Sequence, residues 1–429
     1  IEYYKVPKYD TNYSWALYEA AMTQFAMDDF EKSIKTSKEV LKVDPNESNA
    51  YVNLGNCYDE LKNYEEAEKW YDLGIEKFPF NHMLYVNKAI MFEKREENKK
   101  AFETYQKLID FNPMYPSTHL HLGYMNVKEG NLAQGLLSLS MFLMLEPSSG
   151  RTYSTLSYME SVAGMQSADY NTIDKKQLEN GFKDLDQLID NKIALNAKYK
   201  TPSKLQVNAV KQMHLILTEM NKGQGSGFYK DFYGDIYKQV MDKGQFDTYA
   251  TLLVASGTSS SIKKALAKKL EAVKTMHQWF KSEFRDIHKD YELEYDGKKE
   301  SLSAYFNDGL GLLCFGNENA DGKPEGEYIY YYNDGRIRSK GVLNNEGNRN
   351  GAWNFYNREG DRIRTNTYSD GKLQGPYKIY FDHGTLKEEG SYNNDKVDGS
   401  LKVYHANGAL WIEGGYVDGE QQEIGRAHV

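Results

Sequence analysis

Nine histidines and two cysteines are the side chains with which this 429-residue sequence could hold a metal ion or activate a nucleophile. Cys57 and Cys314 lie far apart and match no metal-binding or redox spacing. His277 and His288 are 11 residues apart, which in one helix separates them by about 16 Å, too far to share a metal ion. The sequence contains no zinc-protease, Cys-x-x-Cys, serine-hydrolase or phosphate-loop motif. We therefore predict no catalytic residues, no metal site, no cofactor and no enzymatic activity.

Four other histidines occur in repeated segments, where packing explains them. His119 and His121 alternate across one predicted helix, and His383 and His405 occupy matching turns of two predicted hairpins. The net charge of −9 argues against a nucleic-acid binder, because neutralising phosphates requires a basic face. The longest apolar run, residues 136–145, is about half of what a membrane-spanning helix needs, so no transmembrane segment is predicted.

Prolines mark a regular period in the first part of the chain. They are spaced 34 residues apart, at Pro45, Pro79, Pro113 and Pro147. Each follows an apolar pattern typical of a helix, and proline stops a helix because it lacks the backbone donor. Small and aromatic residues recur within the period, for example Tyr51, Leu54, Gly55, Tyr58, Ala67, Tyr71 and Gly74. The period predicts helix pairs that stack on their neighbours.

This pattern resembles the tetratricopeptide repeat and assigns residues 1–165 to an all-α solenoid of four repeats and a partial fifth. The resemblance implies that the first helix of each pair lines a concave surface, which binds a peptide or protein partner. The side chains expected there are Tyr18, Met22, Val52, Asn56, Val86, Ile90, Leu120 and Tyr124. Packing between neighbouring repeats is the alternative explanation for most of them. Apolar anchors are expected, because the cations that clamp a C-terminal carboxylate in some tetratricopeptide domains are missing.

In residues 166–301 we recognise no family, and helical patterns continue, so we interpret them as a helical extension or linker domain. The predicted helices are 174–196, 203–221, 228–243, 245–255 and about 259–291. The last is expected to be capped at Ser259 and to bury Ile262, Ala265, Leu270, Val273, Met276, Phe280 and Phe284. A hydrolase is a third hypothesis, and it would need a deep polar pocket in this region.

A second period, of 24 to 25 residues, follows a shift in composition near residue 302 towards Gly, Asn, Asp and Tyr. Its four segments start at Gly326, Gly351, Gly375 and Gly399. Each alternates in the manner of a strand, ends in a glycine turn and is followed by a second strand. The pattern resembles MORN repeats, in particular the bacterial antitoxin-like variety (YwqK family). The resemblance implies an all-β sheet of stacked hairpins over residues 302–423.

One aromatic position recurs in every hairpin, at Tyr331, Tyr356, Tyr380 and Tyr404. Packing explains this row, and the alternative is that an exposed row binds a glycan or a partner strand. Residues 326–423 carry 12 Lys/Arg and 15 Asp/Glu, a net charge of −3, whereas attraction to lipid needs clustered cations. The cations that could form a small basic strip are Arg336, Arg338, Lys340, Arg358, Arg362 and Arg364.

These features predict an α+β multidomain protein, with an N-terminal helical solenoid, a helical extension and a C-terminal sheet. The predicted function is a scaffold or adaptor, whose solenoid holds a peptide or protein and whose sheet engages a second partner or an envelope component. The alternative is an antitoxin-like regulator that neutralises an adjacent toxin. The oligomeric state is not specified by the sequence.

The composition and the pairing of repeats resemble proteins of a Bacteroidetes-type bacterium. Because the sequence starts at Ile1 rather than methionine, we expect that an upstream signal was lost, and we favour a periplasmic or envelope-associated location over a cytoplasmic one. Residues 424–429 match the translation of a sequencing adapter, with a genuine tail as the alternative, and they are left out of the domain assignment.

Overall fold

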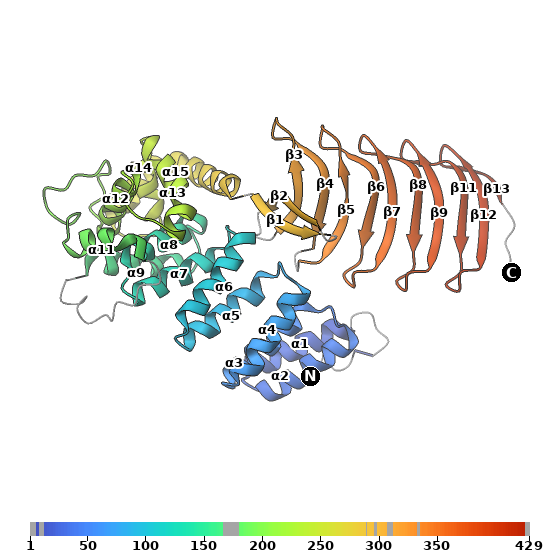
Figure 1. The fold of residues 1–429 in the computed structure, drawn as a ribbon, viewed down its shortest axis with the longest axis horizontal. Helices are drawn as coiled ribbons and strands as arrows, with labels where there is room; N and C mark the ends of the chain where they lie inside the picture. The colour runs from blue at the N-terminus through green and yellow to red at the C-terminus, as the bar shows by residue number, and fades with distance from the viewer. Residues whose placement is uncertain are drawn as a thin grey trace. The chain divides into compact units, whose positions relative to one another are not determined.

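Antiparallel helices succeed one another from the N-terminus in the computed structural model of this chain, and a ladder of strands follows them (Figure 1). The structure describes residues 6–7, 13–165, 180–288, 290–295, 298–306, 312–332 and 335–424. The chain divides into two units, of which the first combines Ile1–Leu84 with Lys289–Val429 and the second is Tyr85–His288. Each unit is described by itself. No helix within the described ranges is long and apolar enough to cross a membrane.

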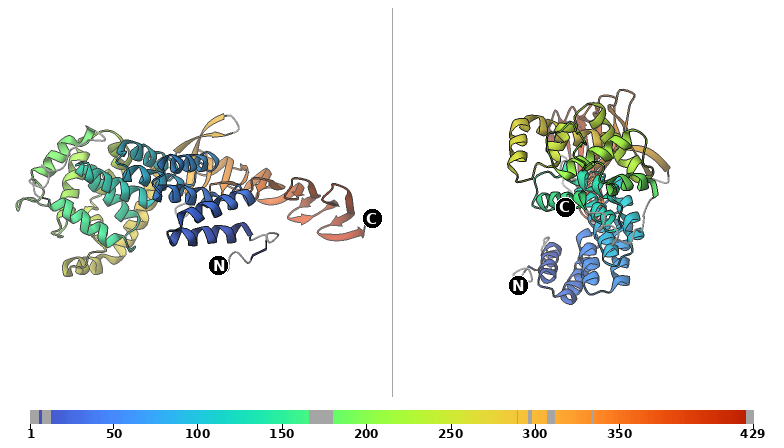
Figure 2. Two further views of the ribbon diagram at one scale, coloured as in Figure 1. Left: turned by 90° about the horizontal axis from the view of Figure 1, so that it is seen from below. Right: turned by 90° about the vertical axis from the view of Figure 1, so that its left-hand side faces the viewer.

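The 34-residue period corresponds to helix pairs, as predicted. The helices are α1 (Tyr13–Ala26), α2 (Phe30–Val43), α3 (Ser48–Glu60), α4 (Tyr64–Lys77), α5 (His82–Lys94), α6 (Asn98–Phe111), α7 (Pro116–Lys128), α8 (Leu132–Leu145) and α9 (Thr152–Gly164). The boundary between the two units falls within α5. Figure 2 shows the paired helices from two further directions. A Cβ atom at Gly55 would lie 2.3 Å from the ring of the buried Tyr71, so α3 and α4 pack this closely because residue 55 has no side chain.

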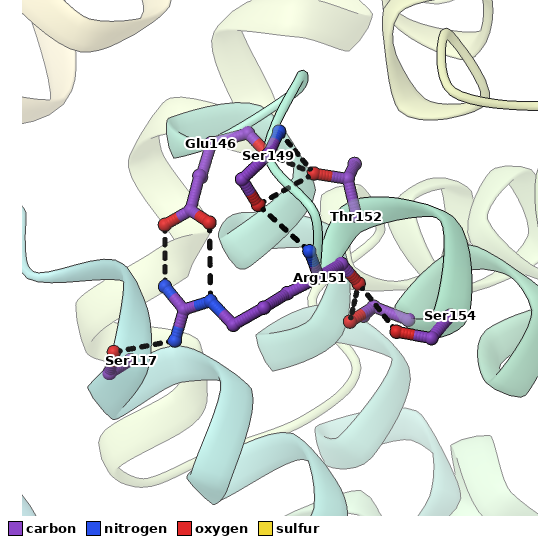
Figure 3. Close-up of polar contacts among 7 residues, drawn as sticks. Ser117, Glu146, Ser149, Arg151, Thr152 and Ser154 are labelled. Carbon is purple, nitrogen blue, oxygen red and sulfur yellow. Dashed lines mark hydrogen bonds and ion pairs between the residues drawn. The ribbon is translucent and has the colours of Figure 1, made fainter.

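An arginine fastens the last of these helices to the repeat before it. The Arg151 guanidinium donates to both carboxylate oxygens of Glu146, at 3.2 and 2.6 Å, and to the Ser117 hydroxyl at 2.8 Å (Figure 3). Ser117 and Arg151 are 34 residues apart and hold equivalent positions in successive repeats. The Thr152 hydroxyl donates to the Glu146 carbonyl oxygen at 3.0 Å. These contacts join the end of α8 to the start of α9.

Two helices of the helical middle are shorter than the apolar pattern predicts. Its elements are the 3₁₀ turn η2 (Asn180–Phe182), α11 (Lys183–Asp190), α12 (Asn208–Asn221), α13 (Phe228–Asp242), α14 (Phe246–Leu253) and α15 (Ser260–Ile287). The first predicted helix ends at Asp190 rather than 196, because Lys192 has a φ of +53°; its residues 174–179 lie outside the described ranges. The second starts at Asn208 rather than 203, where the Glu160 carboxylate accepts from the backbone N–H groups of Asn208 and Ala209.

The long helix α15 begins at its predicted cap, since the Ser259 hydroxyl accepts from the Ile262 N–H. It ends at Ile287, earlier than predicted, because the first strand starts at Asp290. Most of its predicted stripe is buried, but Leu270 is 45% exposed. Lys269 has non-helical φ and ψ, so the helix is kinked next to Leu270, and the prediction that Leu270 is buried was wrong.

The strands form one antiparallel sheet, with 13 strands within the described ranges. They are β1 (Asp290–Tyr295), β2 (Lys298–Phe306), β3 (Leu312–Glu318), β4 (Pro324–Tyr331), β5 (Ile337–Leu343), β6 (Arg349–Tyr356), β7 (Arg362–Ser369), β8 (Lys372–Tyr380), β9 (Leu386–Asn393), β10 (Lys396–Val397), β11 (Gly399–Tyr404), β12 (Leu410–Val417) and β13 (Glu420–Ile424). The four predicted hairpins are β4–β5, β6–β7, β8–β9 and β11–β12. The sheet starts at Asp290, before the shift in amino-acid composition near residue 302.

Each predicted hairpin has the same irregularity before its turn. In each hairpin the pairing register shifts between the last two paired residues of the first strand, for example between Tyr330 and Tyr331. Such a shift indicates a β-bulge. The turn glycines have φ between +82° and +90° and are Gly335, Gly360, Gly384 and Gly408. Glycine adopts this conformation without strain, so the turn geometry explains why glycine recurs every 24 to 25 residues.

Candidate interaction surfaces

The eight predicted partner-binding residues form two rows in the helical repeats, each with a 34-residue spacing. The first row is Tyr18, Val52, Val86 and Leu120, and the second row is Met22, Asn56, Ile90 and Tyr124. In the first row the valines and the leucine are buried, with exposures of 4 to 7%, and Tyr18 is half-buried. All four members of the second row are half-buried. Packing therefore accounts for most of the first row, and the second row remains reachable from solvent.

Two members of the second row also make contacts inside the repeats. The side-chain amide oxygen Oδ1 of Asn56 accepts from the Tyr71 hydroxyl at 2.7 Å, which links α3 to α4. The ring of Tyr124 meets the edge of Tyr158 on α9, with centroids 4.9 Å apart. A binding role for these two residues would therefore use only the part of each side chain that packing leaves exposed.

A buried polar seam, which the sequence did not predict as a unit, joins α13 to the repeats of the second unit. Tyr229, Tyr233 and Tyr237 are buried and stand one helical turn apart. Their hydroxyls contact Asn126, His119 and Ser140, the last two at 2.8 and 3.0 Å. The Asn126 side-chain amide donates to the Tyr229 hydroxyl within this seam. The four-residue spacing of the tyrosines was the signal in the sequence.

The helical middle contains a cavity that bears on the hydrolase hypothesis. This cavity has a volume of about 460 Å³ and lies beside α12 and α13. Lys230, Asp231 and Asp235 line it, and its lining contains no histidine, serine or cysteine. No group of three His, Cys, Asp or Glu side chains able to hold a metal ion occurs within the described ranges.

Both cysteines are buried and free. Burial raises the pKa of the Cys57 thiol to about 11 and that of Cys314 to about 12. Because the thiolate is the nucleophile, these protonated thiols are suited to packing and poorly suited to catalysis.

The predicted aromatic row of the sheet lies at the bulges before the turns. Tyr331 is buried, and its ring lies 5.7 Å from Phe315 and 5.3 Å from Phe80, a loop residue of the same unit. Tyr356, Tyr380 and Tyr404 are half-buried. The Tyr404 hydroxyl donates to Glu389 at 2.7 Å, and this carboxylate raises the pKa of Tyr404 to about 12.

A second row, which the sequence analysis missed, forms the centre of the sheet. This central ring row is Tyr328, Trp353 and Tyr377, with exposures of 2% or less. Each ring covers a glycine on a neighbouring strand, so that a Cβ atom there would lie 2.2 to 2.9 Å from ring atoms; the glycines are Gly316, Gly341 and Gly390. Glycines within the second strands were the available signal, because a ring can cross only where the opposite side chain is missing.

Most cations of the predicted basic strip each lie over a different aromatic ring. Arg336 lies over Phe78, Arg338 over Tyr330, Arg358 over Tyr332 and Arg362 over Tyr380, with guanidinium carbons 5.0 to 6.0 Å from the ring centroids. Lys340 lines a cavity of about 180 Å³ with Glu327 and Asn354. Stacking on rings thus explains most of these cations.

Known families and proteins match parts of this chain. Models of the tetratricopeptide repeat match residues 16–47 and 48–81, and a model of a MORN repeat variant matches residues 373–394. The photosystem I assembly protein Ycf3 of Synechococcus sp. (strain CC9311) is 34% identical over 82 residues, which are 19% of this chain and 45% of that protein. The chain thus spans less than half the length of this curated relative. It contains tetratricopeptide repeats at its N-terminus and a MORN repeat at its C-terminus.

Solved structures with low sequence identity also resemble part of the chain. A crystal structure of MamA is 15% identical, covers 47% of this chain and 95% of its own, and gives a TM-score of 0.31. Pseudomonas aeruginosa PilF is 14% identical, covers 63% of this chain and 97% of its own, and gives a TM-score of 0.32.

Proposed function

We propose that this protein is a non-enzymatic scaffold. Its helical repeats bind a peptide or protein partner, and its sheet binds a second partner or an envelope component. Tetratricopeptide repeats are protein-interaction modules, and the family matches at residues 16–47 and 48–81 support this assignment. The proposal depends chiefly on the second row, which is half-buried in each unit: Met22 and Asn56 in the first unit, Ile90 and Tyr124 in the second. Within each unit, half-buried apolar side chains such as Met22 and Ile90 offer anchors for a partner segment.

Affinity capture with the full-length chain tests the proposal. Ile90→Asp places a charge in the second row, and we expect it to lose the partner that the unmodified chain retains. Leu73→Asp is the matched control, because Leu73 is 40% exposed and lies on α4, the second helix of its pair. Retention of the same partner by both variants, or by neither, would contradict binding through the second row.

A further inference from the structure

Three arginines gather on the face of the sheet that carries the central ring row. Arg338 on β5 lies 6.0 Å from the ring centroid of Tyr330, and Arg349 on β6 lies 4.6 Å from that of Trp353. Tyr330 and Trp353 belong to one hydrophobic cluster. Arg364 on β7 is the third member and joins Arg349 through hydrogen bonds. We call Arg338, Arg349 and Arg364 with the rings beneath them the arginine face.

Neutral side chains hold two of these arginines in one hydrogen-bonded network. Arg349 Nη1 donates to the Tyr368 hydroxyl at 3.3 Å, and Asn366 Nδ2 donates to the same hydroxyl at 3.1 Å. Arg364 Nε donates to Asn366 Oδ1 at 2.8 Å, and its Nη2 donates to the Tyr392 hydroxyl at 3.1 Å. Asn366 is 3% exposed. The network fixes both guanidinium groups without using a negative charge.

Among the described residues, two lysines on the opposite face of the sheet pair with carboxylates, whereas the three arginines do not. Lys378 pairs with Glu389 and Lys402 with Glu413, each at 3.7 Å. Lys378 follows Tyr377 in β8, and neighbouring residues of a strand point to opposite faces. Within the described ranges no carboxylate forms an ion pair with any of the three arginines. Glu388 lies on the same face and accepts from the Tyr377 hydroxyl at 2.7 Å, so the positive surface is confined to the surroundings of the three arginines on a chain of net charge −9.

We propose that the arginine face binds an acidic, extended segment of a partner protein. The inference rests on the scaffold function and specifies the chemistry of the sheet's partner. A guanidinium that stacks on a ring keeps N–H donors for a carboxylate, often in a bidentate pair. Because the network already orders Arg349 and Arg364, binding costs less conformational entropy. A nucleic acid fits less well, since it needs many phosphate contacts and the chain is acidic.

Fluorescence anisotropy with the full-length chain tests this proposal. The probe is a fluorescein-labelled ten-residue peptide of alternating Glu and Leu, and its matched control has Gln in place of Glu. We expect the acidic peptide to bind about tenfold or more tightly than the control, since charge-assisted hydrogen bonds exceed neutral ones in strength. We also expect its affinity to fall as ionic strength rises. Equal affinity for the two peptides, or no binding of the acidic one, would overturn the proposal.

Variants locate the site and separate this proposal from the scaffold function. Arg349→Gln with Arg364→Gln is expected to weaken acidic-peptide binding about tenfold or more. Lys402→Gln on the opposite face, and Ile90→Asp in the helical repeats, are expected to leave it unchanged. A loss of peptide binding in Lys402→Gln equal to that in the arginine variant would overturn the assignment. So would tighter binding of a ten-nucleotide single-stranded RNA or of phosphatidylglycerol vesicles than of the peptide.

Discussion

His119 is a potentially reactive side chain that has a structural role in the interior of this protein. Its Nε2 lies 2.8 Å from the Pro113 carbonyl oxygen, which only accepts, so Nε2 carries the proton. Its Nδ1 therefore accepts from the Tyr233 hydroxyl at 2.8 Å. Burial lowers the pKa of His119 to about 4, and burial likewise lowers the pKa of His288 to about 4. The neutral ring is a structural link between α7 and α13.

This link predicts a pH dependence of stability. An unfolded histidine has a pKa near 6.5, so between about pH 6.5 and 4 the unfolded chain holds a proton that folded His119 does not. The free energy of unfolding therefore falls as the pH falls through this window. We expect His119 to account for about 2 kcal/mol of the loss between pH 7 and 5.

Denaturant titration at both pH values measures this loss for the unmodified chain and for His119→Gln. The variant is expected to be less stable at pH 7 but to lose less stability on acidification. His383→Gln is the control, because His383 is exposed, and its slope should match that of the unmodified chain. Identical slopes for the unmodified chain and His119→Gln would contradict the buried, neutral histidine.

Among the elements, the hairpins depend on glycines that leave room for the central ring row. A Cβ atom at Gly341 would lie 2.5 Å from the fully buried ring of Trp353. Gly341→Ala is therefore expected to lower the free energy of unfolding by about 1–3 kcal/mol, as overpacking does elsewhere. Gly415→Ala is the control, since Gly415 on β12 has no atom within 4 Å of the added carbon. Equal melting temperatures for the two variants would show that the ring does not need this space.

The helix pairs depend in turn on contacts between their ends, of which the Arg151 contacts are the clearest (Figure 3). Arg151→Ala removes the bidentate pair with Glu146 and the bond to Ser117. We expect a loss of about 1 kcal/mol, because Arg151 is partly exposed and exposed pairs contribute little. Hydrogen exchange should quicken first in α9. Lys128→Ala is the control, since its pair with Glu96 is exposed on both sides; the same effect on α9 would contradict the assignment.

Local pattern was sufficient to predict the kinds of element but not their docking. The 34-residue prolines and the turn glycines predicted the helix pairs and the four hairpins, because each signal acts within a few residues. The start of α12 was misplaced because its cap, Glu160, is 48 residues away. The tyrosine seam and the arginine network were missed for the same reason, since their partners are brought together only by packing. Leu270 was misassigned, and the apolar pattern did not reveal the kink at the neighbouring Lys269.

At the scale of the whole molecule, one chain contains two kinds of repeat, the helix pair and the hairpin. A single helix pair or hairpin cannot bury its apolar face alone, and each becomes stable when a neighbour covers it. In the helical repeats and in the hairpins alike, this packing buries one row of side chains. These rows are the first row in the helices and the central ring row in the sheet. The residues left reachable are those to which we assign partner binding: the second row on the helices and the arginine face on the sheet.

Hydroxyl-radical footprinting of the full-length chain, alone and with its captured partner, tests the scaffold account most directly. Met22 belongs to the half-buried second row, and Met27, five residues later in sequence, is 73% exposed at the end of α1. The account predicts that a partner bound to the first unit protects Met22 from oxidation and leaves Met27 unchanged. Protection of Met27 with no change at Met22 would contradict it.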